Sequence, residues 1–248
     1  MHLKIQGLVL RVVPYKDNDA ILSILTADRG VLSAKARGIR RKNSPLIAGC
    51  QLLAYTEFVL FEHRDFYTIN EAHTIHLFPQ LRRDISKLSL ATYFAHAADL
   101  ISQEDAYNPQ LLPLVLNCLY ALCNLDIPQA QIKAVFELRL ACIAGYTPDL
   151  QGCMRCGNSV PNRFDISMGH LECDTCRDSQ SNGIRMPVTP GTLDAMRYIV
   201  FCEPRRLFAF QAGQDTLEQL SQISESYLSS QLERGFSTLD YYKTVSAQ

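Results

Sequence analysis

Apolar and polar positions alternate with a period of two through much of the segment 1–78. Such alternation predicts β-strands, because successive side chains of a strand point to opposite faces. Turn residues, including Asp17-Asn18-Asp19 and Asp28-Arg29-Gly30, separate the apolar segments. The expected strands cover residues 4–14, 20–25, 31–36, 52–62 and 66–77. These five strands have no helical period between them, so they predict an antiparallel unit and a small closed barrel of the OB-fold type.

After Pro79 the apolar positions recur every three or four residues, which predicts helices. The fourth helix has Thr189 as N-cap and Pro190 at its first position. One face of the first helix is expected to contain Leu81, Ile85, Leu88, Thr92, Ala95 and Leu100. The expected helices cover residues 81–102, 109–125, 128–145, a segment from 189 onward, and 217–235. Residues 241–248 form a tail for which we expect no anchoring contacts. The predicted fold is therefore α+β, with a barrel domain at 1–78 and a helical domain at 79–248.

The composition is typical of a globular protein, with 47% hydrophobic residues. We find no apolar run near the roughly 18 residues needed to span a bilayer, and the first residues do not resemble a secretory signal. We therefore expect a cytoplasmic protein with no membrane partner.

Charge is distributed unevenly, although the net charge is only −1. The segment 1–78 contains 10 Lys and Arg against 7 Asp and Glu, a balance of +3, while the segment 79–248 contains 14 against 18, a balance of −4. The two regions are thus expected to contact different partners.

A basic run follows the third predicted strand. It contains five cations within a short stretch, and no acidic residue occurs between Asp28 and Glu57. The five are Lys35, Arg37, Arg40, Arg41 and Lys42. Such a run is often only a solvated surface, but this one leaves a strand of an OB-type barrel and includes Gly38, which frees the backbone. We therefore expect it to neutralise nucleic-acid phosphates without reading sequence.

Aromatic side chains near this run are a second candidate for nucleic-acid contact, because every base has a face that can stack on a ring. They are Tyr15, Tyr55, Phe58, Phe61, Phe66 and Tyr67. Most lie within alternating strands and are expected in the barrel core. Tyr15 and Tyr67 lie beside turns and are the better stacking candidates.

Two C-x-x-C pairs lie within the helical region, inside an expected module at residues 150–180. They are Cys153 with Cys156 and Cys173 with Cys176, and the segment 157–172 separates the pairs. Two residues inside each pair let both thiolates turn onto one ion, and four thiolates satisfy tetrahedral Zn²⁺ with no open position. We therefore predict one structural zinc ion.

Two alternatives to this interpretation concern the same segment. A single C-x-x-C is also typical of a redox dithiol, but the turn-forming residues around both pairs favour a metal. His170 is an alternative ligand that would replace one thiolate. The other five cysteines are scattered among apolar residues and are interpreted as free thiols.

A short basic and apolar segment, Pro204-Arg205-Arg206-Leu207, connects the last two predicted helices. It is interpreted as a loop with two solvated arginines. The alternative is a surface that receives an acidic peptide through arginine–carboxylate pairs.

Two segments of the chain resemble the RecO family of recombination mediator proteins. The first contains Gly7-Leu8-Val9-Leu10-Arg11, Tyr15, Asp17-Asn18-Asp19, Leu25-Thr26, Gly30 and Ala36-Arg37-Gly38; the second contains Gly145-Tyr146-Thr147-Pro148, the four cysteines, Phe164 and Gly169. Arg11 and Tyr15 of the first segment are added to the expected DNA contacts.

This resemblance implies an N-terminal OB-fold, a helical domain with the zinc module, and binding to single- and double-stranded DNA. It also implies annealing of complementary strands, RecR as a partner, and help in loading RecA, an indirect partner, onto strands coated by single-strand-binding protein. A DNA-bound protein of this kind would be associated with the nucleoid.

Motifs of common enzymes are missing from the sequence, including the G-x-x-x-x-G-K-[ST] loop, the H-E-x-x-H helix and the G-x-S-x-G elbow. We therefore expect no catalytic residues. Two alternatives to a DNA mediator remain: a zinc-containing adaptor that binds RNA or protein, and a metal-dependent hydrolase, which the closed thiolate site disfavours.

Overall fold

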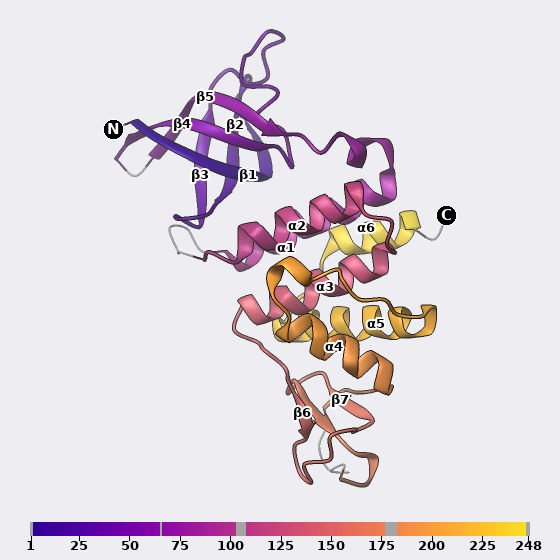
Figure 1. Ribbon diagram of the computed structural model, residues 1–248. Coiled ribbons are helices and arrows are strands. Elements are labelled where there is room, and N and C mark those ends of the chain that lie inside the picture. The colour runs from indigo at the N-terminus through magenta and orange to yellow at the C-terminus, as the bar shows by residue number, and fades with distance from the viewer. Residues whose placement is uncertain (1, 65, 103–107, 177–182, 247–248) are drawn as a thin grey trace. The chain divides into compact units, whose positions relative to one another are not determined.

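The structure is a computed structural model that describes residues 2–64, 66–102, 108–176 and 183–246 (Figure 1). It confirms the predicted fold class, a closed five-stranded barrel followed by a helical region that carries the cysteine module. By compactness the chain forms two units, Met1–Leu125 with Phe236–Gln248, and Asp126–Gly235. We place the predicted boundary after residue 78 because the pattern changes there from strands to helices. The two units are defined by compactness instead, so their boundary falls elsewhere.

The barrel contains five strands in the order β1-β2-β3-β5-β4, and β1 closes it by pairing with both β2 and β4. The strands are β1 His2–Tyr15, β2 Asp19–Thr26, β3 Val31–Ala36, β4 Tyr55–His63 and β5 Phe66–His76. The expectation of a purely antiparallel unit is wrong for one pair, because β3 and β5 run parallel. The next strand in the chain, β4, pairs with β1 instead of β3. The edge of β3 that does not face β2 therefore pairs with β5.

The segment before β4 departs from the predicted strand. Residues 52–54 are not extended, because Leu53 has a left-handed backbone with φ 65°. The segment still bonds to β1, with the Leu53 amide donating to the Val9 carbonyl at 2.9 Å and the Val9 amide donating to the Ala54 carbonyl at 3.0 Å. These bonds seat the segment against β1 where the pairing of β1 with β2 shifts register after Val9.

The barrel core is built from the inward positions of all five strands. It includes Val9, Leu22, Ile24, Leu32, Ala34, Phe58, Leu60, Tyr67 and Ile69. Gly7 lets β1 and β2 approach each other, because a Cβ atom at this position would lie 2.4 Å from Ile24 Cγ2 and 2.9 Å from the Leu25 carbonyl oxygen. A larger residue there would force the two strands apart.

Helices α1, Ile85–Ile101, and α2, Leu111–Asn124, belong to the same unit as the barrel. The prediction that the first helix begins at residue 81 is wrong, because Pro79–Arg83 forms a 3-10 turn, η1, and Asp84 caps α1 by accepting a bond from the Lys87 amide at 3.0 Å. The predicted inward face is also wrong in part. Ile85 and Leu100 are exposed, and the buried positions include Leu90, Ala91, Phe94, Ala97 and Ala98.

The C-terminal segment is a helix rather than the unanchored tail expected from the sequence. Helix α6, Ser237–Ser246, packs on α1 and buries Leu239 and Tyr242. The Phe236 ring contacts the Tyr93 ring edge-on, with centroids 5.3 Å apart. The prediction failed because so short a helix carries too little apolar pattern to be recognised without the helix that covers it.

The second unit contains helices α3 Gln129–Ile143, α4 Pro190–Phe201 and α5 Gln214–Gln231. A small sheet of order β6-β8-β7-β9 lies between α3 and α4 in the chain. Its strands are β6 Asp149–Cys153, β7 Arg163–Asp165, β8 His170–Glu172 and β9 Arg185–Pro187, and the short turns η2, Asp174–Cys176, and η3, Pro204–Arg206, complete the unit. The predicted N-cap is confirmed, since the Thr189 hydroxyl accepts a bond from the Thr192 amide.

Helices α3 and α5 are joined by buried charges that the apolar pattern did not predict. Lys133 and Glu137 are 3% and 0% exposed. The Lys133 ammonium lies 3.1 Å from a Glu137 carboxylate oxygen and 2.9 Å from one of Glu225, and Ser224 donates to Glu137 at 2.6 Å. Each buried charge thus has a partner, as burial in a low dielectric requires.

Among the described helices, none has the length and apolar character needed to cross a membrane.

Replacing Phe236 with Ala tests whether the C-terminal helix is anchored. We expect the free energy of unfolding to fall by about 3 kcal/mol or more, because the change removes a buried ring. Chemical denaturation provides the measurement, and Tyr241→Ala is the control because Tyr241 is 54% exposed on α6, which begins just after Phe236. Equal stability of the two variants would contradict the packing described here.

Candidate nucleic-acid interface and metal centre

The basic loop, residues 37–42, is held in place by the turn between β1 and β2. A carboxylate oxygen of Asp19 accepts a bond from the Gly38 amide at 2.8 Å, and the other lies 2.9 Å from the Lys35 ammonium. The Arg40 amide donates to the Asn18 carbonyl at 3.0 Å. These bonds tie two loops that lie apart in the sequence, on either side of β2 and β3, into one surface.

Asp19 is the positioning residue of this surface. The Gly38 amide, and then the Lys35 ammonium, lower the pKa of the Asp19 carboxyl below its ordinary value, so it is ionised at neutral pH. Gly38 has φ +66°, a left-handed conformation that lets the chain turn sharply after β3. The sequence identified Asp19 only as part of a turn. Its bond to Gly38 depends on the pairing of β2 with β3.

The predicted DNA-contacting cations fall into two groups. Arg37, Arg40, Arg41 and Lys42 are exposed, and none of them forms an ion pair with another described residue. Lys35 is partly buried and pairs with Asp19. Arg11 lies 3.1 Å from a carboxylate oxygen of Asp99 on α1 and also donates to the Ser23 hydroxyl. Of the predicted DNA-contacting cations, the four in the loop are therefore the ones whose charge is not paired within the described residues.

Tyr15 lies beside the basic loop with its ring already in contact with cations. The ammonium of Lys35 is 4.8 Å from the ring centroid, and that of Lys16 is 5.5 Å from it. Both distances are in the range of cation–π attraction. Tyr15 is 40% exposed, so part of its ring faces solvent.

The other aromatic predictions need two corrections. Tyr67 is only 7% exposed and lies in the barrel core, so its interpretation as a stacking candidate is wrong. Phe61 and Phe66 are 39% and 77% exposed, so they are not core residues. The strand period explains both results, because Tyr67 faces inward between outward-facing Phe66 and Thr68. Phe58 is buried as expected.

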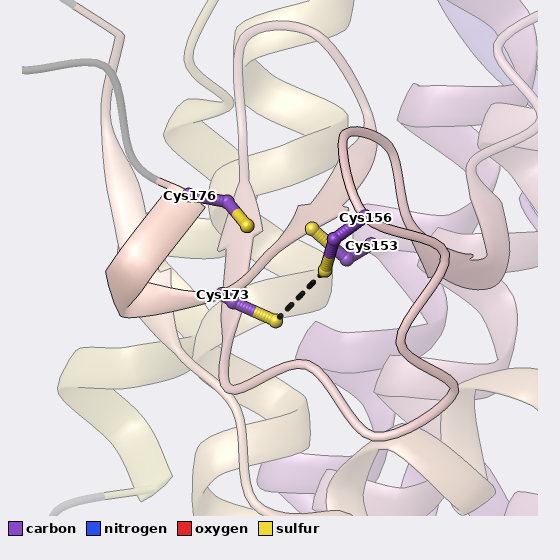
Figure 2. Close-up of side chains that lie close together, drawn as sticks. All are labelled: Cys153, Cys156, Cys173 and Cys176. Atoms are coloured by element: carbon purple, nitrogen blue, oxygen red, sulfur yellow. Dashed lines mark hydrogen bonds between the residues drawn. The ribbon is translucent and has the colours of Figure 1, made fainter.

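The four cysteines of the two C-x-x-C pairs come together on the small sheet (Figure 2). Their sulfur atoms all lie within 4.8 Å of one another, and those of Cys156 and Cys173 are 3.9 Å apart. Four thiolates about 2.3 Å from one tetrahedral ion would be separated by about 3.8 Å. The spacing therefore suits a metal ion, and it is too long for a disulfide.

The chemistry of the cluster also favours a cation. Burial acts to raise the pKa of the Cys153 thiol, but bonds from the backbone amides of Cys156, Arg155 and Cys173 outweigh it and lower the pKa to about 6. The pKa of Cys176 is raised to about 11, first by its interaction with the Cys156 thiol and then by burial. Without a metal the sulfurs cannot all be ionised together, because their charges repel. A divalent cation removes that repulsion.

This geometry accompanies close similarity to known proteins over nearly the whole chain. Residues 1–78 match the family model described as Recombination protein O N terminal, and residues 82–240 match Recombination protein O C terminal. A DNA repair protein RecO of Acetivibrio thermocellus is 36% identical over 250 residues, covering 98% of this chain and 97% of that protein. The chain belongs to the RecO family. A DNA repair protein RecO of Alkaliphilus metalliredigens is 31% identical, covering 99% of this chain and 100% of that protein.

Asn158, interpreted from the sequence only as a turn-forming residue, also supports the cysteine cluster directly. Its side-chain amide donates to the Cys173 sulfur at 3.3 Å, and its backbone carbonyl accepts a bond from the Cys153 amide at 2.8 Å. Gly157, with φ +72°, turns the chain between Cys156 and Asn158. This RecO-family chain thus connects both C-x-x-C pairs through one asparagine. Only the position of Asn158 just after Gly157 suggested a turn.

His170 does not join the sulfur cluster. Its Nε2 atom lies 3.2 Å from a Glu172 carboxylate oxygen, and the other oxygen of Glu172 accepts a bond from Arg185 at 2.7 Å. Arg185 also lies 3.5 Å from a carboxylate oxygen of Asp165. These four side chains form a separate, largely buried ion-pair network that joins β7, β8 and β9. The alternative in which His170 replaces a thiolate is therefore not supported.

The Pro204–Arg206 segment forms the 3-10 turn η3, and the two arginines are exposed as expected. Leu207, the apolar part of the patch, is only 3% exposed. The Tyr198 hydroxyl donates to the Arg206 carbonyl at 2.7 Å and fixes the turn to α4. The segment thus has two solvated arginines, as the loop interpretation expected, and Leu207 is buried beneath them rather than offered to a peptide.

Proposed function

We propose that this RecO-family protein is a recombination mediator that binds single- and double-stranded DNA and anneals complementary strands without ATP. It acts with RecR to help load RecA onto strands coated by single-strand-binding protein. The observation that carries the DNA-binding part is the exposed basic loop, held on the barrel by Asp19. Family membership supports the partners.

The charge distribution supports phosphate binding. Arg37, Arg40, Arg41 and Lys42 lie in one short loop, so their charges act on the same stretch of DNA. Each cation that neutralises a phosphate releases condensed counterions, which favours binding to any sequence. The loop contains no acidic residue, so nothing within it offsets this attraction.

Annealing requires no covalent chemistry in this proposal. Two complementary strands repel each other, and holding both near one set of cations lowers the charge barrier to pairing. It also lowers the entropic cost of bringing the strands together, because both are bound before they pair. The described residues supply the cations, and the sequence contains no nucleotide-binding loop of the G-x-x-x-x-G-K-[ST] type that would couple the process to ATP.

We further propose that the cysteine cluster holds one zinc ion with a structural role. Cys153, Cys156, Cys173 and Cys176 would provide all four ligands and leave no position for a reacting water. A closed thiolate site contributes to folding because its ligands come together only in the folded chain. The ion would thus fix β6 against η2 and the end of β8.

Neutralising the basic loop tests the DNA interface. We expect the variant Arg37→Gln, Arg40→Gln, Arg41→Gln and Lys42→Gln to bind DNA more weakly at every sequence. The slope of log K against log salt for single strands should become shallower by ~3, because each lost phosphate contact removes about 0.7. Fluorescence anisotropy of labelled oligonucleotides at several salt concentrations gives both values.

A matched pair of double variants provides the control for the loop. Arg40→Gln with Arg41→Gln removes two charges from the loop, and Arg205→Gln with Arg206→Gln removes two exposed charges from η3. The first should weaken binding more than the second. Equal effects would show that net charge, rather than the loop, determines affinity.

Removing two thiolates tests the metal centre. We expect Cys153→Ser with Cys156→Ser to lose the bound zinc and several kcal/mol of unfolding free energy, whereas Cys123→Ser retains both. The folded variant should keep its DNA affinity. Elemental analysis and denaturation provide the measurements, and wild-type protein without stoichiometric metal would refute the proposal.

The metal centre should also depend on pH. Cys176 has a raised pKa in the metal-free cluster, so metal binding must displace its proton. Zinc affinity and the stability that it provides should therefore be present at about pH 8 and decline as the pH is lowered toward about 5. Titration with a chelator at both pH values measures this change, and a pH-independent affinity would contradict thiolate ligation.

Annealing of complementary oligonucleotides tests the central activity. We expect the wild-type protein to accelerate annealing without ATP, including on strands coated by single-strand-binding protein, and the four-site loop variant to be slower. Fluorescence quenching between labelled strands follows the rate. Tight DNA binding without acceleration would instead favour an adaptor function.

A further inference from the structure

Four exposed rings lie together on the outer surface of the barrel. The Phe61 ring centroid is 5.5 Å from that of His2 and 6.4 Å from that of His63, and the rings of Phe61 and His63 are close to parallel, at 19°. Phe66 is paired with His63 across the β4–β5 hairpin and is 77% exposed. We call these four residues the aromatic ladder. None of them belongs to the cluster of buried residues that forms the barrel core.

Strand register places the aromatic ladder in line with Lys35, which pairs with Asp19 and lies two residues before the basic loop. Lys35 of β3 is opposite Thr68 of β5, Thr68 is opposite Phe61 of β4, and Phe61 is opposite His2 of β1. Residues opposite each other in a sheet share a face, so these side chains form one row on the barrel exterior. Lys35 and Phe61 are separated by two strand spacings, about 10 Å.

The neighbouring row contains the other two rings of the aromatic ladder and no Lys or Arg at the positions named here. It is reached by moving two residues along each strand from Lys35, Thr68 and Phe61, which keeps to the same face. The residues there are Ser33 of β3, Phe66 of β5 and His63 of β4. Neither row contains an acidic side chain at these positions. Apart from Lys35 and the rings, the residues named in the two rows are Thr68 and Ser33, which have small hydroxyl side chains. A polyanion that lies across the rows therefore meets no opposing charge at these positions between Lys35 and the rings.

We propose that the aromatic ladder stacks unpaired bases of single-stranded DNA whose phosphates are held by the basic loop. The inference rests on the proposed DNA binding and adds to it a site for bases. Exposed rings on neighbouring strands, in line with a lysine that precedes a cationic loop, provide stacking faces for any base. Bases of a duplex are already stacked on each other, so the aromatic ladder should favour single strands over duplex.

A single tryptophan provides a direct probe of stacking. The chain has no tryptophan, so Phe66→Trp introduces the only one, at the more exposed of the two phenylalanines. Its fluorescence should be quenched when oligothymidylate is added and should change little with an abasic strand of equal length. Phe201→Trp is the matched control, because Phe201 is 63% exposed at the end of α4.

Alanine variants measure the contribution to affinity. Phe66→Ala with Phe61→Ala should weaken binding of oligothymidylate about fivefold to tenfold, while binding of the abasic strand and of duplex DNA stays close to wild type. Phe66→Trp should retain affinity for the single strand. Both phenylalanines are exposed, so the variants should fold, and circular dichroism verifies this.

The outcomes separate this inference from the proposed function. If the four-site loop variant loses DNA binding but the double alanine variant binds oligothymidylate like wild type, the aromatic ladder is not a base site. If neither variant changes binding, the proposed DNA interface fails as well. Loss of self-association in the double alanine variant, with unchanged DNA binding, would mean that the rings contact a second copy of the chain and would overturn the inference.

Discussion

Closure of the barrel through β1 is the constraint on which the rest of the nucleic-acid surface depends. One strand hydrogen-bonds to β2 along one edge and to β4 along the other, so the register of every strand is fixed relative to every other. Gly7 permits the close approach that this double pairing requires. Because side chains alternate across a strand, closing the barrel determines at once which residues are buried and which face solvent.

Register then determines which charges are available for DNA. Lys35 and the carboxylate of Asp19 are neighbours because β2 pairs with β3. Their ion pair neutralises one of the five cations of the basic run. Arg11 is similarly engaged by Asp99. The remaining cations lie beyond the end of β3, where no carboxylate of the described residues comes within ion-pairing distance. Pairing rather than sequence position thus separates structural cations from those that can hold phosphates.

The small sheet of the second unit combines buried apolar side chains, such as Leu150, Phe164 and Leu171, with polar and sulfur contacts. Its strands are short and are held by side-chain chemistry. Four sulfurs meet at one place, and Arg185 joins Asp165 and Glu172 at another. Asn158 links the two C-x-x-C pairs. These connections add to the apolar burial of the sheet, which is limited because its strands are short.

Local patterns in the sequence were sufficient for the fold class, the five strands, the N-cap at Thr189 and the assembly of the four cysteines. Each of these depends on residues close together in the chain or on a ligand spacing that any fold must satisfy. Tertiary structure alone determined that β3 pairs in parallel with β5. It also determined that Tyr67 is buried while Phe61 and Phe66 are exposed. The packing of α6 on α1 was likewise decided only in the folded chain. Tertiary structure also determined that Lys133 and Glu137, which pair with each other on α3, could be buried, because their further partners Glu225 and Ser224 lie on α5. The physical reason is the same in each case: the free energy of a side chain depends on neighbours that only the folded chain brings to it.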